Sequence, residues 1–169
     1  MAETTLTKKI KIALYRYTKA HLLGVYGVFE CAMGANTIGY GKEFVDFLTM
    51  DSNSEFRCYE IKVSKQDLYS EANLSFYGDY NYLVVPDNLY EDAFAFIKER
   101  YGTRGMVGIL VYNKNGGISS RLRASKQNLR IEQRVANMYN MVRSGSRYTT
   151  KWVKTQTEKQ DIKNDLDML

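Results

Sequence analysis

The chain contains 169 residues, enough for one domain with a sizeable core and a short appendage. Its composition, 44% hydrophobic and 25% charged, is typical of a folded globular protein and excludes a disordered chain. No apolar run approaches the roughly 20 residues of a membrane helix. The polar, Lys-rich start lacks the apolar region of a signal peptide, so we expect a cytoplasmic protein that does not enter the membrane.

Cysteine and histidine are too scarce for several kinds of site. Cys31 and Cys58 are the only cysteines and His21 is the only histidine, which excludes a multi-cysteine or multi-histidine zinc centre. We expect two free thiols rather than a disulfide, as is usual in the cytoplasm. His21 lies near the end of a predicted helix, where a structural role is favoured over catalysis.

Periodicity predicts one helix and three strands in the first half of the chain. The helix has a core-facing stripe at helical spacing that includes Tyr17 and His21. Two later apolar runs flank a segment of turn-forming residues and predict a β-hairpin. The expected elements are a helix over 5–23 and strands over 25–33, 44–50 and 58–65.

Strands and helices alternate in the second half. Ser64 and Asp67 have the spacing of a capping box and predict a helix start. The last helix should turn Leu129, Val135, Met138 and Val142 toward the body. The expected elements are a helix over 64–74, a strand over 80–85, a helix over 89–101, strands over 106–112 and 118–122, and a helix over 125–143. This order favours an α/β fold with a mixed sheet flanked by helices.

The basic residues are concentrated in one segment. Residues 114–154 contain ten basic residues and one acid, Glu132, a net charge of +9 that leaves −4 for the rest of the +5 chain. Six of the ten are arginine, the residue suited to phosphate. This asymmetry indicates an anionic partner, with nucleic acid the first candidate. The alternative is a solvated basic face.

Three of the predicted strands carry ionisable residues in apolar surroundings. Glu30, Asp46, Glu60 and Lys62 lie on the strands over 25–33, 44–50 and 58–65. Charged groups on apolar strands are costly unless they are paired or bind a metal. If the hairpin register brings Asp46 beside Glu60, two carboxylates and an ammonium converge in a way that suits Mg²⁺ and a phosphate ester. The alternative is a half-exposed hairpin with an ordinary Glu–Lys pair.

The same residues resemble the motif of the PD-(D/E)XK, or restriction-endonuclease-like, nucleases. The series is Glu30, Asp46 and Glu60-Ile61-Lys62, with Val45 in place of the motif's proline. A closer resemblance, to the MmcB-like DNA-repair family of that superfamily, covers residues 25–125. Its motifs are Glu60-Ile61-Lys62-Val63-Ser64-Lys65-Gln66-Asp67-Leu68 and Asp79-Tyr80-Asn81-Tyr82-Leu83-Val84-Val85-Pro86.

This resemblance implies a restriction-endonuclease-like core, helix-strand-strand-strand-helix-strand, over residues 1–124. It implies that Asp46 and Glu60 bind Mg²⁺ or Mn²⁺, that Glu30 is a further metal ligand, and that Lys62 assists the attacking water. Lys65 and Asp67 would support the site or contact backbone phosphate. The resemblance is also compatible with a homodimer.

The basic region lies outside the resemblance and its role is inferred from charge. We expect a basic C-terminal helix and extension over 125–155 and a polar, flexible tail over 156–169. The residues expected to contact nucleic acid are Lys65, Arg121, Arg123, Lys126, Arg130, Arg134, Arg143, Arg147 and Lys151.

The sequence therefore predicts a metal-dependent deoxyribonuclease that acts in DNA repair, recombination or phage-type DNA processing. We expect a bacterial or phage-type protein. The first alternative is a non-catalytic DNA- or partner-binding module on a nuclease fold, since fold does not fix function. A second alternative is an RNA-directed or anti-defence protein that uses the same basic surface.

Overall fold

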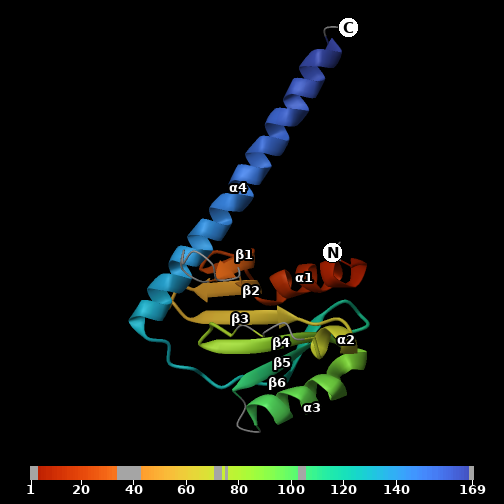
Figure 1. The fold of residues 1–169 in the computed structure, drawn as a ribbon, viewed down its shortest axis with the longest axis vertical. Helices are drawn as coiled ribbons and strands as arrows, with labels where there is room; N and C mark the ends of the chain where they lie inside the picture. Colours follow the sequence, from red (N-terminus) through yellow and green to blue (C-terminus); the bar gives the residue numbers. More distant parts are fainter. Residues whose placement is uncertain (1–3, 34–42, 71–73, 75, 103–105, 168–169) are drawn as a thin grey trace.

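The computed structural model describes residues 4–33, 43–70, 74, 76–102 and 106–167. Helices and strands follow one another in the predicted order (Figure 1). They are α1 (Thr5–Tyr17), β1 (Val25–Met33), β2 (Glu43–Asp51), β3 (Phe56–Ile61), α2 (Lys65–Leu68), β4 (Tyr80–Pro86), the 3₁₀ turn η1 (Asp87–Leu89), α3 (Tyr90–Tyr101), β5 (Val107–Tyr112), β6 (Ile118–Leu122) and α4 (Ile131–Asp167).

The six strands form one mixed sheet in the order β1-β2-β3-β4-β5-β6. The β1–β2 and β2–β3 pairs are antiparallel, the β3–β4 and β4–β5 pairs are parallel, and β6 returns antiparallel to β5. Parallel neighbours need a crossover, and α2 and α3 lie in the two connections that supply it. The predicted α/β class is therefore confirmed.

The helix α1 covers one face of the sheet. Ile10 and Leu14 are fully buried and pack with Phe47 of β2 and Tyr59 of β3. The N-cap is Thr4, whose hydroxyl accepts a hydrogen bond from Thr7 N.

The predicted end of this first helix at residue 23 is wrong. The helix ends at Tyr17, and the chain turns through Lys19, which has a positive φ of 59°. Tyr17 and His21, expected in the core-facing stripe, are both exposed. Their spacing continues the helical period only if the helix itself continues, and it does not.

The helix α3 covers the opposite face over β4 and β5. Ala93 and Ile97 of α3 pack with Leu83, Val85 and Ile109 of the sheet. These sheet residues alternate with Val84 and Leu110, which face α1. The short helix α2 adds Leu68 to this core, and Ser64 is its N-cap as predicted, with Oγ accepting from Asp67 N at 3.1 Å. However, α2 ends at Leu68 rather than at the predicted residue 74.

The last helix differs most from the prediction. It begins at Ile131 rather than 125 and continues through residues 144–146 to Asp167, where we expected an end near 143 and a polar tail from 156. Its body-facing side is largely polar, because Asn137, Asn140 and Ser144 are buried there together with one apolar residue, Met141. Figure 1 shows the second half of α4 projecting well beyond the sheet. None of the described helices is both long enough and apolar enough to cross a membrane.

The residues expected to face the body from this helix are mostly on its outer side. Val135, Met138 and Val142 are exposed rather than buried, although Met138 and Val142 border an open hollow that β1 also lines, while Leu129 is half-buried against the core. The reason is that much of α4 packs along β1, the edge of the sheet, while Met141 alone of the described buried α4 residues reaches the apolar core around Cys31 and Val45. A strand edge presents backbone donors and acceptors, which need polar partners.

Side chains of α4 supply those partners. Ser144 Oγ accepts from Ala32 N at 3.1 Å, and Arg143 donates to Ala32 O at 3.2 Å. Arg147 donates to Glu30 O at 3.2 Å, and Tyr148 Oη donates to Phe29 O at 2.9 Å. The helix thus covers the edge strand with hydrogen bonds, which blocks pairing with another strand there.

Candidate active site

The site predicted from sequence lies where β1 and β2 lose their regular pleat. Phe29 and Phe47 are paired and face α1, while the next pair outward, Cys31 and Val45, faces α4. Residues two apart on a regular strand share a face, so the pleat is broken between these pairs. Glu30, at the break in β1, has a positive φ of 48°, which is uncommon for a residue with a side chain.

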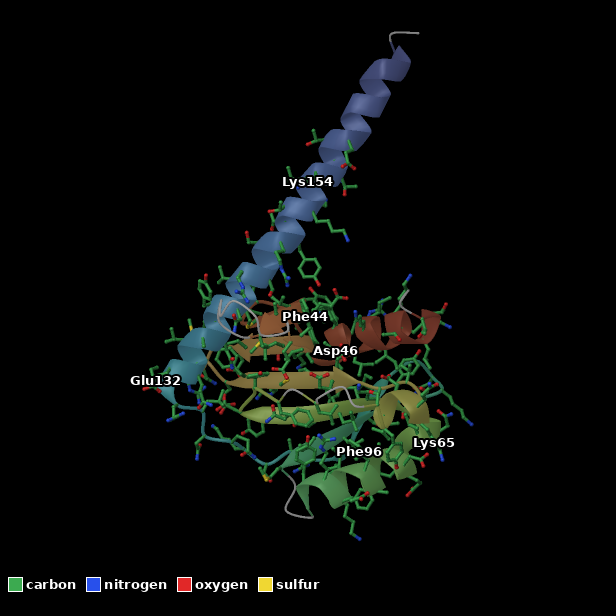
Figure 2. The ribbon with its side chains drawn as sticks, in the orientation of Figure 1. Phe44, Asp46, Lys65, Phe96, Glu132 and Lys154 are labelled. Atoms are coloured by element: carbon green, nitrogen blue, oxygen red, sulfur yellow. The ribbon has the colours of Figure 1, made fainter. Side chains whose placement is uncertain are left out.

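Asp46 occupies the break in β2 and points toward the neighbouring strand. The β2–β3 ladder ends at the pair Phe47–Tyr59, and beyond it Asp46 Oδ2 accepts a hydrogen bond from Ile61 N at 2.7 Å. The carboxylate therefore accepts the hydrogen bond of the backbone N–H of Ile61, a buried residue that lies beyond the last pair of the β2–β3 ladder. Lys11 of α1 acts on this carboxylate, and Figure 2 shows Asp46 in the part of the sheet near that helix.

The surroundings of Asp46 oppose and support its charge at once. Burial raises the pKa of its carboxyl, and the hydrogen bond from Ile61 N, together with the charges of Lys62 and Lys11, lowers it without reversing the upward shift. The nearby Asp67 carboxylate raises the pKa further. A carboxylate whose charge costs free energy in the folded protein, among two lysines, is a candidate for a functional group.

Lys62 follows the end of β3, and both its backbone and its side chain are held in place. Its backbone N donates to Val84 O at 3.0 Å, and only 7% of the residue is exposed. Its Nζ lies 3.4 Å from Asp67 Oδ1. Asp67 is itself fixed, because its Oδ2 accepts from Val63 N at 3.1 Å. The capped start of α2 therefore aims a buried ammonium at the region of Asp46.

Glu60 is buried, with 5% of the residue exposed. Its negative charge contributes to the raised pKa values of Cys58, Tyr77 and Tyr101, for each of which burial is the larger cause. The Cys58 thiol is also affected by the charge of Asp46. The charges of the two carboxylates expected to hold a metal therefore both act on Cys58, which is buried and, as expected, not in a disulfide.

Three residues near the site were not identified from the sequence. Glu43, at the start of β2, accepts a short hydrogen bond from Tyr77 Oη. Lys11 of α1 lies 3.1 Å from Glu30 Oε1 and also acts on Asp46. Glu43 carries a usable signal, since it is a further acid three residues before Asp46. Lys11 and Tyr77 carry none, because their proximity depends on the tertiary fold.

Glu30 lies apart from Glu60. Its side chain is 60% exposed and paired with Lys11 on the α1 side, whereas Glu60 lies near the tyrosines of the other side. No group of three or more His, Cys, Asp or Glu side chains suited to a metal occurs among residues 4–33, 43–70, 74, 76–102 and 106–158. The fit for a divalent cation therefore depends on Asp46 and Glu60. Two carboxylate donors are enough for Mg²⁺, which usually completes its coordination with water and substrate phosphate.

Most residues of the predicted nucleic-acid set have protein partners. Arg134 makes two bonds to the buried carboxylate of Asp79, at 2.6 and 2.9 Å. The other partners are Asp92 for Lys65, Asp87 for Arg121, Glu55 for Lys126, and the β1 carbonyls for Arg143 and Arg147. Within the described chain, Arg123, Arg130 and Lys151 are exposed and make no ion pair. Figure 2 shows Lys65 beside α3 rather than beside Asp46.

The arrangement is suited to chemistry on an anionic substrate. The Lys62 ammonium and the Asp46 carboxylate lie at one end of β3, and Lys11 adds positive charge from α1. Fixed charges in a partly dehydrated site stabilise developing charge more strongly than they would in water.

Comparison with known proteins gives a likeness of fold alone. No protein-family model matches the chain, and no curated protein matches it. A solved structure described as the SPO1766 protein of unknown function from Silicibacter pomeroyi is similar, with a TM-score of 0.65 and 16% sequence identity. The match covers 92% of this chain and 96% of that one, so the similarity extends over nearly the whole fold.

Proposed function

We propose that this protein is a metal-dependent nuclease that hydrolyses DNA phosphodiester bonds on a restriction-endonuclease-like core. The observation that carries the proposal is the position of Asp46. Its carboxylate lies where the β2–β3 ladder ends, with its pKa raised by burial, beside the buried Lys62. The hydrogen bond from Ile61 N needs only an acceptor, which an uncharged Asn would also supply, so the charge kept at this position favours a functional role.

The order of elements is compatible with that core. One helix precedes three antiparallel strands, and a crossover leads to a fourth strand parallel to the third. The acidic pair and Lys62 come from β2, β3 and the residue after β3. These are the positions that the resemblance in sequence assigns to the motif.

Each residue has a role that follows from its contacts. Asp46 and Glu60 would hold a Mg²⁺ or Mn²⁺ ion, which supplies a Lewis acid for the phosphoryl oxygen. Lys62, oriented by Asp67, stabilises negative charge on the phosphate and orients the attacking water. Asp67 acts through Lys62 as a positioning residue.

Cleavage of a labelled DNA panel tests the proposal. Linear duplex, single strand, flap and four-way junction are incubated with Mg²⁺, Mn²⁺ or EDTA. We expect metal-dependent cutting by the wild type and a loss of about 10²-fold or more in Asp46→Asn, Glu60→Gln and Lys62→Met. Glu91→Gln, which neutralises an exposed acid on α3, is the matched control and should cut normally. Cutting that survives in all three site variants contradicts the proposal.

A non-catalytic binding module is the second candidate. The observation that favours it, in its partner-binding form, is the engagement of six of the nine predicted nucleic-acid residues in internal contacts, which leaves fewer free cations for a phosphate backbone. Salt-sensitive DNA binding without cutting by the wild type in any metal supports this candidate against the nuclease.

A further inference from the structure

The projecting helix α4 carries an apolar stripe that the body leaves exposed. We define the α4 stripe as Ile131, Val135, Met138, Tyr139, Val142, Trp152 and Val153. Ile131 is 67% exposed, Val142 73% and Trp152 63%. From the exposed fractions of these side chains and the 150–250 Å² of a large aromatic group, the stripe leaves roughly 800 Å² of apolar surface in water. The residues form two groups, one from Ile131 to Val142 and one at Trp152 and Val153, and their summed area matches one side of a standard protein interface, about 800 Å².

The stripe has the spacing of a coiled-coil seam. Steps of four and three residues alternate from one end to the other without interruption, through Ile131, Val135, Met138, Val142, Gly145, Thr149 and Trp152. This is the heptad pattern that places side chains along one side of a helix against another helix. Since it spans 22 residues, the seam is about 33 Å long.

The second half of α4 needs support that the body does not supply. The last hydrogen bond from α4 to the sheet is that of Tyr148 to Phe29 O, yet the helix continues to Asp167. Figure 1 shows this half standing clear of the sheet. Most helical stability in proteins comes from tertiary packing of an amphipathic face rather than from propensity, so a partner that covers the stripe would stabilise this half of the helix.

The two ends of the seam are complementary in shape. Ile131, Val135 and Tyr139 line an open hollow of about 540 Å³ at the start of the helix. Trp152, the only tryptophan of the chain, stands exposed near the other end. Between them lies Gly145, where an added Cβ would meet no atom within 4 Å. One helix thus carries a knob at one end, a hole at the other and a small residue between.

We propose that the α4 stripe is the dimer interface of this protein, in which α4 of a second copy packs antiparallel along it. The register that seats the partner's Trp152 against Val135 also sets Met138 against Thr149 and Val142 against Gly145. Every large residue of the middle section then meets a small one. A two-fold axis repeats each contact, as in other isologous dimers.

The antiparallel direction follows from the same residues. In a parallel pair Gly145 would face Gly145 and Trp152 would face Trp152, which leaves a gap in one place and crowding in another. In the antiparallel pair the projecting half of each α4 covers the anchored half of the other. The positive charges of Arg143 and Arg147 do not oppose this, because both are directed to β1 carbonyls. This inference does not depend on the proposed nuclease activity.

Sedimentation equilibrium of the full chain tests the proposal. We expect a mass of about 39 kDa, twice the 19.5 kDa of one chain. Val142→Glu, at an exposed position, should give a folded monomer with unchanged helical circular dichroism near the monomer mass. Gln133→Glu adds the same charge to the same helix away from the stripe, keeps the acceptor for Arg130 N, and should remain dimeric. A monomeric wild type, or a Val142→Glu protein that stays dimeric, overturns the proposal.

Two further readouts establish the contact and its direction. Trp152 fluorescence should shift to longer wavelength on dilution through the dimer dissociation constant, because its indole becomes exposed. Met138→Cys and Thr149→Cys proteins should form a disulfide-linked dimer under mild oxidation only when the two are mixed. Self-crosslinking of either single variant would show a parallel pair and contradict the antiparallel register. The native thiols do not interfere, since both are buried.

Discussion

Replacement of Asp46 separates a structural carboxylate from a functional one. Its Oδ2 accepts from Ile61 N at 2.7 Å, and its pKa is raised by burial. Asn keeps an oxygen for the Ile61 donor and removes the charge, whereas Ala removes both. We therefore expect Asp46→Ala to be less stable than Asp46→Asn by about 1–3 kcal/mol, the cost of a buried amide left without an acceptor. For a chain of this length, each kcal/mol corresponds to about 2–4 °C in Tm.

The pH dependence gives the sign of the charge effect. A carboxyl whose pKa is higher in the folded than in the unfolded protein contributes stability below its unfolded pKa, near 3.9, and loses it as pH rises through the folded pKa. The stability of the wild type relative to Asp46→Asn should therefore fall as the pH rises from about 4 through the folded pKa. Above the folded pKa, Asp46→Asn should be the more stable protein.

Urea denaturation followed by circular dichroism, in steps from pH 3.5 to pH 8, measures both effects. An Asp46→Asn protein that loses stability relative to the wild type as pH rises would refute the reasoning, because the ionised carboxylate would then stabilise the fold. In that case Asp46 would be explained by its hydrogen bond and its lysine neighbours. An Asp46→Asn protein that is more stable and unable to cut DNA would show a group retained at the expense of stability.

Two other contacts give measurable expectations. Arg134→Met leaves the fully buried Asp79 carboxylate without its bidentate partner. This variant should lower the free energy of unfolding in urea titrations by about 3–5 kcal/mol. The control Arg130→Met should change the same free energy by less than about 0.5 kcal/mol. Unchanged stability of Arg134→Met would mean that Asp79 is not charged or not dependent on the pair. Arg123→Gln and Lys151→Gln, at exposed sites without ion pairs, should each reduce the slope of log K for duplex DNA against log salt by about 0.9. Slopes equal to that of the wild type would place the DNA surface elsewhere.

Features set by neighbouring residues could be predicted from the sequence. The strands over 25–33 and 118–122 have the predicted bounds, and Ser64 caps α2 through Asp67 as its spacing indicated. Each depends on alternation or on a side chain that reaches its own backbone, so one stretch of chain is enough to reveal it.

The geometry around Asp46 could not be predicted in the same way. Regular alternation would place the residue on one face of the sheet, yet the break at Glu30 turns it toward Ile61. The contribution of Lys11 comes from a helix that precedes β1 by several residues. Both are consequences of how two strands and a helix pack together, and no local pattern in the sequence reports them.

The helix α4 shows why a hydrophobic pattern can mislead. Apolar periodicity predicts the buried side only where a helix packs on an apolar surface. Along a strand edge the buried side must supply hydrogen bonds, so Asn137, Ser144 and Arg143 lie inward, Met141 is the apolar residue buried with them, and Val135, Met138 and Val142 stay exposed. The same requirement explains much of the basic charge, which the sequence alone assigned to nucleic acid.

The site and the α4 stripe lie on different parts of the molecule, and this separation makes a joint prediction. Asp46, Glu60 and Lys62 all belong to one sheet, so a monomer contains every residue of the proposed catalytic site. If the dimer positions two such sites, supercoiled plasmid should be linearised by the wild type, while the monomeric Val142→Glu should cut one strand at a time and accumulate nicked circles. Gln133→Glu should behave as the wild type. Complete loss of nicking in Val142→Glu, with its fold intact by circular dichroism, would instead mean that the site needs the second copy to be assembled.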